Sequence, residues 1–135
     1  VYEKADKNWK TNMAEKGAYV VQEGSDTPDI TILASGSEVN MALKAASLTS
    51  GKTIRVVSVP DLKKFSNLCC CEQEKIIGKA KRVVCTEAGV STEWLQFAKK
   101  EDCFCIDRFG TSGPANKVAE YLGFTAEKLA ELLSK

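Results

Sequence analysis

The stretch DITILASGSEVNMALKAASLTSGKTIRVVSVP, residues 29–60, decides the fold because it reads as a strand, a helix and a second strand. Residues 29–36 form a β-branched apolar run that ends in glycine, as buried strands do. Ser37 is placed to cap the helix that follows. TIRVVSVP (53–60) is the next apolar run, and it stops at a proline. The apolar residues that repeat at helical spacing between the two runs are Val39, Ala42, Leu43 and Ala46.

The same alternation continues on both sides of this unit. Apolar runs at 17–24, 82–89 and 103–110 predict three further strands, each bounded by glycine or a polar turn. Helices are predicted at 72–80 and at 114–122. Another is predicted after a cap at Ser91 or Thr92 and runs through 94–98, and a last one follows a cap at Thr125 and carries Leu129, Leu132 and Leu133 on one face.

Strands that alternate with helices predict an α/β fold with a mostly parallel sheet and helices on both faces. The first strand, 17–24, is followed by the second after only a few residues, whereas a parallel crossover needs about a dozen. We therefore expect a three-layer α/β/α domain of about five strands, with the first strand antiparallel. The polar segment 1–16 is predicted to be a linker or docking segment with Trp9 as a possible anchor, and 17–135 the domain itself.

Composition narrows the class of protein. The 135 residues correspond to one domain. The net charge of +1 comes from 19 basic and 18 acidic residues that are interleaved, so the chain has no field that would attract nucleic acid or an anionic membrane. No apolar stretch approaches about 18 residues and no signal-peptide pattern is present, so the expected location is the cytoplasm.

The six cysteines and the absence of histidine bear on chemistry. Cys69, Cys70 and Cys71 are consecutive, and their thiols are candidates for exposed, oxidisable groups, but nothing near them in the sequence indicates a catalytic nucleophile. A zinc site would need paired cysteines at a suitable spacing or histidine partners, so reduced, mostly structural thiols are favoured. Histidine is the usual general acid or base near neutral pH, so its absence argues against a self-contained active site. The other three cysteines lie within apolar runs, at Cys85, Cys103 and Cys105.

A ligand site, if present, is expected beyond the carboxyl ends of the strands, where open α/β sheets bind ligands. Gly/Ser loops, helix N-termini and a guanidinium gather there, which is typical of an anion site. The alternative is that glycine and serine serve the strand-to-helix turns, and this is favoured because no established phosphate-binding motif is present. The residues of the possible anion site are Ser37, Arg108, Gly110 and Ser112.

Glu87 and Asp107 lie near the ends of two strands that are expected to be neighbours. Paired carboxylates can carry out acid–base chemistry. Arg108 follows Asp107 directly, however, so a structural ion pair or a subunit contact is the preferred interpretation. No catalytic, cofactor-binding or metal-binding residue is predicted in this chain. Trp94 and Phe97 are expected to belong to the core or to an interface.

The order of the segments resembles one known family. PDITILASGSEV (28–39), IRVVSVPDLKKF (54–65), VVCTEAG (83–89), a helix with a tryptophan and CIDRFGTSGPANKVAEYLGFTAEKLAE (105–131) together resemble the C-terminal domain of transketolase. The resemblance runs from about Gly17 to the last residue. Its most specific part is IDRFGTSGP followed by LGFT, which favours transketolase over 1-deoxyxylulose-5-phosphate synthase and the β subunit of 2-oxoacid dehydrogenases.

The resemblance implies a function for the complete protein. Transketolases use thiamine diphosphate and Mg2+ or Ca2+ to move a two-carbon ketol unit from a ketose phosphate to an aldose phosphate in the pentose phosphate pathway. In this family the cofactor and the catalytic histidines belong to the two preceding domains, at the interface of a homodimer. This domain would then be structural, dimer-supporting and inactive by itself. Its implied partners are the other domains and a second subunit, with no nucleic acid and no membrane.

Two segments depart from the family pattern. The residues before Gly17 lack the expected Arg-Gln and Leu-Pro segment, and 66–79, with its cysteine run, replaces a segment that usually carries tyrosine. Two other interpretations stay open at this point. The chain could be a regulatory or partner-binding module with an anion site at the strand ends, or a separate subunit of a split transketolase-like enzyme.

Overall fold

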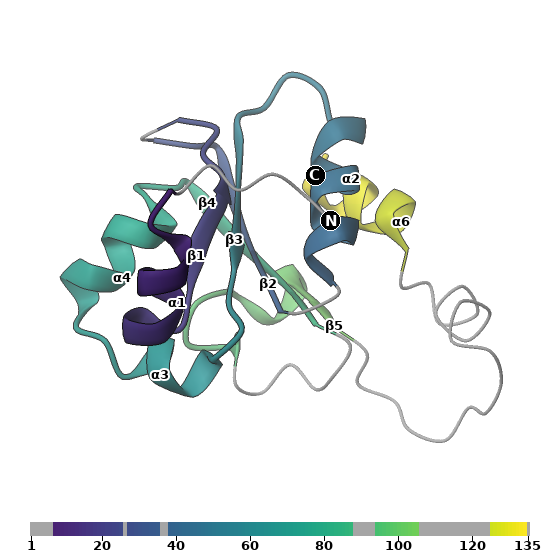
Figure 1. Ribbon diagram of the computed structural model, residues 1–135. Helices are drawn as coiled ribbons and strands as arrows, with labels where there is room; N and C mark the ends of the chain where they lie inside the picture. Colours follow the sequence, from purple (N-terminus) through teal and green to yellow (C-terminus); the bar gives the residue numbers. More distant parts are fainter. Residues whose placement is uncertain (1–6, 26, 36–37, 88–93, 106–124, 135) are drawn as a thin grey trace, which may run out of the picture.

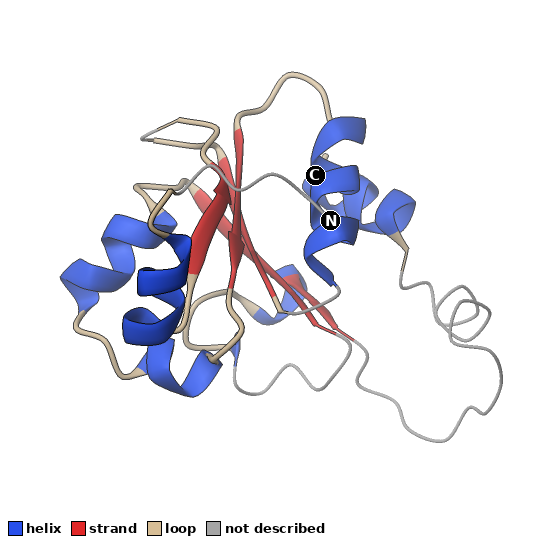
Figure 2. Cartoon of the chain, in the orientation of Figure 1, coloured by secondary structure: helices blue, strands red, loops and turns tan. Residues whose placement is uncertain are grey.

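A five-stranded sheet, in the order β1-β3-β2-β4-β5, forms the middle of the molecule (Figures 1 and 2). The computed structural model describes residues 7–25, 27–35, 38–87, 94–105 and 125–134. β1 is antiparallel to β3 and every other neighbouring pair is parallel, which confirms the predicted sheet. The strands are β1 (Tyr19–Gln22), β2 (Ile30–Ala34), β3 (Ile54–Ser58), β4 (Arg82–Glu87) and β5 (Cys103–Cys105).

The short connection after β1 explains why this strand lies at an edge and runs against its neighbour. β2 occupies the middle of the sheet between β3 and β4, so β1 reaches the free side of β3 instead. Tyr19 lies opposite Ser58 and Gln22 lies opposite Val56, with an irregular register between Val20 and Gln22. An irregularity of this kind bends an edge strand and makes it a poorer template for pairing with another chain.

Helices cover both faces of the sheet, which gives the three predicted layers (Figure 1). α2 (Glu38–Leu48) and α6 (Ala126–Leu133) pack on one face. The other face carries α1 (Trp9–Lys16), α3 (Leu62–Ser66) and α4 (Cys70–Ile77). Because both faces are covered, every residue of β2 and β3 is buried, as expected for central strands of a parallel sheet.

The core therefore has two halves. On the α2 and α6 side, Ile32, Val56 and Val84 meet Leu129 and Leu133, all with no exposed side-chain surface. Removing one such leucine would cost about 2–5 kcal/mol, because the lost transfer energy and the cavity add together. On the opposite side the largest buried side chains are Leu33, Val57, Phe65 and Trp94.

The last helix behaves as the sequence predicts. The Thr125 hydroxyl accepts a hydrogen bond from the backbone N–H of Lys128 at 3.3 Å and so caps α6. Leu129 and Leu133 are buried, and Leu132 is half-buried. In the segments that the structure describes, no helix has both the length and the apolar character needed to cross a bilayer.

The helix predicted at 94–98 is wrong within the described residues. The backbone N–H groups of Phe97 and Ala98 both donate to the carbonyl of Trp94 and close a tight turn. A short 3-10 turn, η2 (Lys100–Asp102), then leads directly into β5. Trp94 and Ala98 are buried whereas Leu95 is 45% exposed, so this one tight turn is enough to place the two buried side chains on the core.

Other predicted elements differ at their boundaries or lie outside the description. α4 begins at Cys70, two residues earlier than predicted, because Cys69 takes the extended N-cap conformation and its carbonyl accepts from the N–H groups of Glu72 and Gln73. β5 is described as far as Cys105. The rest of the predicted strand 103–110 and the predicted helix 114–122 lie outside the described residues.

Helix α1 lies on the domain although it precedes the predicted boundary at residue 17. The Trp9 ring packs against Tyr19 with the ring centroids 5.5 Å apart. Lys64 Nζ donates to the carbonyl of Ala14 at 2.6 Å, and Lys16 pairs with Glu72 at 3.1 Å. The boundary itself stays a prediction.

Candidate functional site

The predicted site lies at the carboxyl edge of the parallel strands. There Ala34 of β2 is in register with Thr86 of β4, and Glu87 of β4 is in register with Cys105 of β5. Glu87 is the one predicted site residue that the structure describes. The anion site and the Asp107–Arg108 pair therefore stay predictions. The site residues outside the described segments are Ser37, Asp107, Arg108, Gly110 and Ser112.

The Glu87 carboxylate connects three parts of the chain at this edge. Its Oε1 accepts a hydrogen bond from the Ser35 hydroxyl at 3.3 Å, just after β2. Its Oε2 accepts a hydrogen bond from the indole N–H of Trp94. Because each oxygen accepts from a donor of the protein itself, Glu87 acts first as a structural link. A role as a general base would in addition require a reacting proton within hydrogen-bond reach.

Sequence reasoning places Glu87 correctly but misses its two partners. Ser35 lies within the predicted loop ASGSE, where the capping position favours Ser37 instead. Trp94 is expected in the core or at an interface, and the structure shows that it is fully buried. The prediction did not consider the polar N–H of the indole, which needs an acceptor. A buried tryptophan normally finds an acceptor for its N–H, and this is the signal that leads to Glu87.

Thr86 is a second polar residue at the same edge. It has no exposed surface, and among the described residues its hydroxyl oxygen has no hydrogen-bond partner. Its register neighbours, Ala34 and Phe104, belong to the core on the α2 and α6 face. A buried hydroxyl in this situation carries a desolvation cost that is not offset by a bond.

A buried guanidinium occupies the opposite part of the sheet. Arg55 is 7% exposed, and its three nitrogens donate to the carbonyls of Glu23 at 3.0 Å, Ile76 at 3.1 Å and Ser25 at 2.8 Å. A Cβ on Gly78 would lie 3.0 Å from Nη1 of Arg55, so the glycine allows this close approach. Arg55 closes the end of α4 onto the loop after β1, which is a structural role that its strand position did not predict.

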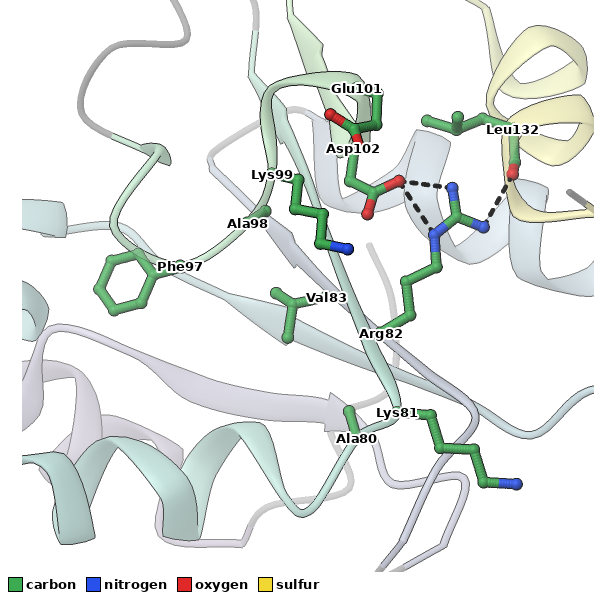
Figure 3. Close-up of a pocket in the computed structure, with 10 residues that line it drawn as sticks. All are labelled: Ala80, Lys81, Arg82, Val83, Phe97, Ala98, Lys99, Glu101, Asp102 and Leu132. Atoms are coloured by element: carbon green, nitrogen blue, oxygen red, sulfur yellow. Dashed lines mark hydrogen bonds and ion pairs between the residues drawn. The ribbon is translucent and has the colours of Figure 1, made fainter.

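The hollow drawn in Figure 3 lies at the amino end of β4, away from the predicted site. It measures about 610 Å3. On its wall, Oδ1 of Asp102 accepts from Nε of Arg82 at 2.9 Å and from Nη2 at 2.6 Å. Nη1 of Arg82 donates to the carbonyl of Leu132 at 3.1 Å (Figure 3). Arg82 thus joins β4 to η2 through the ion pair and to α6 through the carbonyl of Leu132.

The five cysteines whose side chains the structure describes form no disulfide, and they are Cys69, Cys70, Cys71, Cys85 and Cys103. Cys85 is buried on β4 and is in register with Cys103 on β5, as expected for thiols in apolar strands. Cys69, Cys70 and Cys71 are exposed at the start of α4. Across the described segments, no three side chains of the metal-ligating types come together.

The fold and the sequence both match one family. The family model described as the transketolase-like C-terminal domain matches residues 17–125. The chain is 50% identical over 133 residues to the transketolase of Treponema pallidum, which covers 98% of this chain and 20% of that protein. It is 39% identical over 122 residues to a probable transketolase of Streptococcus pneumoniae, covering 87% of this chain and 18% of that protein.

A solved structure agrees with these matches. A crystal structure of a transketolase variant from Pichia stipitis superposes with a TM-score of 0.80 at 29% identity, covering 91% of this chain and 18% of that one. The present chain therefore spans about one fifth of the length of the curated relatives it matches.

Proposed function

The chain belongs to the transketolase family and corresponds to its C-terminal domain, and from this premise we propose that the complete protein is a transketolase. Such a transferase moves a two-carbon ketol unit from a ketose phosphate to an aldose phosphate. The observation that carries the proposal is the 50% identity to a transketolase over 98% of this chain. The reaction itself rests on parts of the protein outside these 135 residues. A cytoplasmic homodimer of the pentose phosphate pathway is the expected form.

Within that enzyme, we assign this domain a structural and dimer-supporting role without an active site of its own. The sequence contains no histidine. The polar groups buried in the described segments are mainly occupied with the fold. Glu87 holds Ser35 and Trp94, and Arg82 holds Asp102. Groups engaged in this way favour a rigid support over a reactive centre.

Thiamine diphosphate and Mg2+ or Ca2+ are proposed for the complete enzyme, outside this chain. When bound, thiamine diphosphate supplies a carbanion that accepts and transfers the ketol unit. A hard divalent cation takes about six or more oxygen ligands, several of them carboxylates. The described segments do not fit such a site, because no three ligand-type side chains converge there. No step of the reaction is therefore assigned to residues of this chain.

Two proteins compared under the same conditions test the proposal. The complete protein, supplied with thiamine diphosphate, Mg2+, a ketose phosphate and an aldose phosphate, is expected to form the chain-extended ketose phosphate. The 135-residue chain is expected to give no product above the protein-free background. Turnover by the isolated chain would overturn the assignment of an inactive domain. An inactive complete protein, with its cofactor shown to be bound, would overturn the proposed reaction.

The supporting role has its own test. A complete protein that lacks residues 17–135 is compared with the intact protein by sedimentation velocity. We expect the shortened protein to shift from dimer toward monomer at the same concentration. A dimer of unchanged stability would contradict the supporting role while leaving the proposed reaction untouched.

A further inference from the structure

The start of α4 brings two thiols into contact. The Sγ atoms of Cys69 and Cys71 are 3.2 Å apart, and both side chains are exposed. A disulfide bond is about 2.05 Å long, so the two sulfur atoms need to approach by only about 1.2 Å to bond. Neighbouring cysteines in a sequence do not in general meet, so this contact depends on the local backbone.

The backbone at this point suits a disulfide. Cys69 is the N-cap residue and is extended, with φ −66° and ψ 157°, whereas Cys70 is the first residue of the helix. The helical conformation of Cys70 sets the distance between the Cα atoms of its two neighbours to about 5.4 Å. This value lies within the range of about 4.4–6.8 Å that disulfides require. The cross-link therefore needs side-chain rotation rather than a rearrangement of α4.

The surroundings favour a thiolate at Cys69. Either sulfur can donate in the contact between the two thiols, and when Cys71 donates the contact holds the pKa of Cys69 below its ordinary value. The same contact raises the pKa of Cys71. The backbone N–H of Glu72 also favours the Cys69 thiolate, although Cys69 makes no regular capping hydrogen bond. One sulfur is thus prepared to attack while its neighbour keeps a proton, as in reactive thiol pairs.

We propose that Cys69 and Cys71 form a redox-active thiol pair that a peroxide converts into an intramolecular disulfide. The Cys69 thiolate attacks one peroxide oxygen, so an S–O bond forms, the O–O bond breaks and the departing oxygen leaves as water after protonation. Cys71 then attacks the sulfenic sulfur of Cys69, so the S–S bond forms and the second water leaves. The two thiols lose two electrons in total and the peroxide gains them. A dithiol reductant reverses the change.

A metal site is the competing use of such thiols, and the geometry disfavours it. In the described part of the chain, no third cysteine, histidine or carboxylate joins the pair as a ligand. The carboxylate that directly follows the pair, Glu72, is already bound by Lys16 at 3.1 Å and by Lys75 at 3.1 Å. The inference does not depend on the transketolase assignment, because it uses this chain's own sulfur atoms.

Peptide mapping of the complete protein after treatment with hydrogen peroxide tests the proposal. We expect the peptide that contains 69–71 to lose two hydrogen atoms, to join Cys69 with Cys71 and to regain the hydrogens with a dithiol. Because this measurement uses the unaltered protein, it does not depend on the folding of a variant. A peptide that stays reduced while buried Cys85 or half-buried Cys103 is oxidised would overturn the proposal.

Three serine variants identify the roles of the thiols. Cys70→Ser is the matched control and is expected to keep the loss of two thiols per chain on mild oxidation. Cys71→Ser is expected to stop at a sulfenic acid on Cys69, which dimedone traps. Cys69→Ser is expected to react at least tenfold more slowly with peroxide. Equal rates for Cys69→Ser and Cys70→Ser would contradict the assignment of the attacking sulfur.

Discussion

The indole N–H of Trp94 donates a hydrogen bond to Oε2 of Glu87, and this bond joins the carboxyl end of β4 to the turn that leads into β5. The tryptophan is fully buried, so its N–H has no access to water. The carboxylate thus supplies the acceptor that burial of the indole requires. The edge of the sheet where ligands usually bind is, in this domain, held together by an internal bond.

Replacement of Glu87 by alanine is expected to lower the free energy of unfolding by about 2–3 kcal/mol, because the variant leaves a buried N–H without an acceptor. Glu87→Gln should lose less, since its amide oxygen can still accept. Urea denaturation followed by circular dichroism measures both. Glu74→Ala is the control because Glu74 is an exposed residue of α4. Similar midpoints for Glu87→Ala and Glu74→Ala would contradict the structural role.

The Arg82–Asp102 ion pair is expected to contribute more to the stability of the fold than exposed ion pairs do. The Asp102 side chain is 10% exposed and Arg82 24%, with the nearest atoms 2.6 Å apart. Asp102→Ala leaves a largely buried guanidinium without its anion, so we expect a loss of about 2–3 kcal/mol in thermal or urea unfolding. Glu131→Gln is the matched control, because its partner Lys128 is exposed and such pairs contribute about 0–1 kcal/mol. Equal losses would contradict the importance of burial.

The sequence predicts the sheet better than it predicts the contacts across it. β-Branched runs and capping residues are local signals, and the short connection after β1 is enough to predict that the first strand is antiparallel. Arg55 has no such signal, because its acceptors are carbonyls of Glu23, Ser25 and Ile76, which the fold brings together from 21 to 32 residues away.

In the candidate site, too, the local features are predictable from the sequence and the long-range contacts are not. The position of Glu87 at a strand end is predictable from the apolar run that precedes it. Its bond to Ser35, 52 residues away, depends on the pairing of β2 with β4. The turn at Trp94 takes the place of a predicted helix, since the N–H groups of Phe97 and Ala98 both donate to the carbonyl of Trp94 and the chain then enters η2 and β5.

Gly17 is expected to be essential for the contact between α1 and α3. It ends α1 with φ 75°, and a Cβ at this position would collide with the carbonyl oxygen of Asp61. Gly51 has a similar φ of 78°, but a Cβ there would meet no atom within 4 Å, so it is the matched control. Gly51→Ala should cost about 1–2 kcal/mol from the left-handed backbone alone.

Gly17→Ala should lose about 1–3 kcal/mol more than Gly51→Ala, because overpacking adds to the same backbone strain. Thermal unfolding of the two variants measures the difference. Identical melting temperatures would show that α1 moves away at no cost.

The lowered pKa of Asp29 predicts that the folded domain loses stability in acid. Its pKa is below the ordinary value, first because its carboxylate accepts from the backbone N–H of Thr53 at 3.0 Å and also because Lys81 lies 3.3 Å away. A lowered folded-state pKa stabilises the fold above the unfolded pKa of about 3.9, and this contribution disappears as the pH falls through the folded value. Asp29→Asn should therefore be less stable than the parent chain at pH 7, and the two should converge as the pH falls through the lowered folded-state pKa of Asp29.

Urea denaturation from neutral to acid pH measures this convergence, and added salt separates its two causes. Because the backbone N–H of Thr53 is the larger cause, about 1 M salt should remove only the smaller part that comes from Lys81. A difference between the two proteins that stays constant with pH would contradict the prediction.

Two buried threonines give a matched test of hydrogen bonding inside the sheet. The Thr31 hydroxyl donates to the carbonyl of Ile77 at 2.7 Å, whereas the Thr86 hydroxyl has no partner among the described residues, and neither residue is exposed. Thr31→Val should lower the free energy of unfolding by about 1–2 kcal/mol, because a carbonyl loses its donor. Thr86→Val keeps the shape and removes an uncompensated hydroxyl, so it should be neutral or stabilising by up to about 1 kcal/mol. The midpoints of urea denaturation measure the stability of both variants. Equal losses of stability in the two variants would contradict the unpaired state of Thr86.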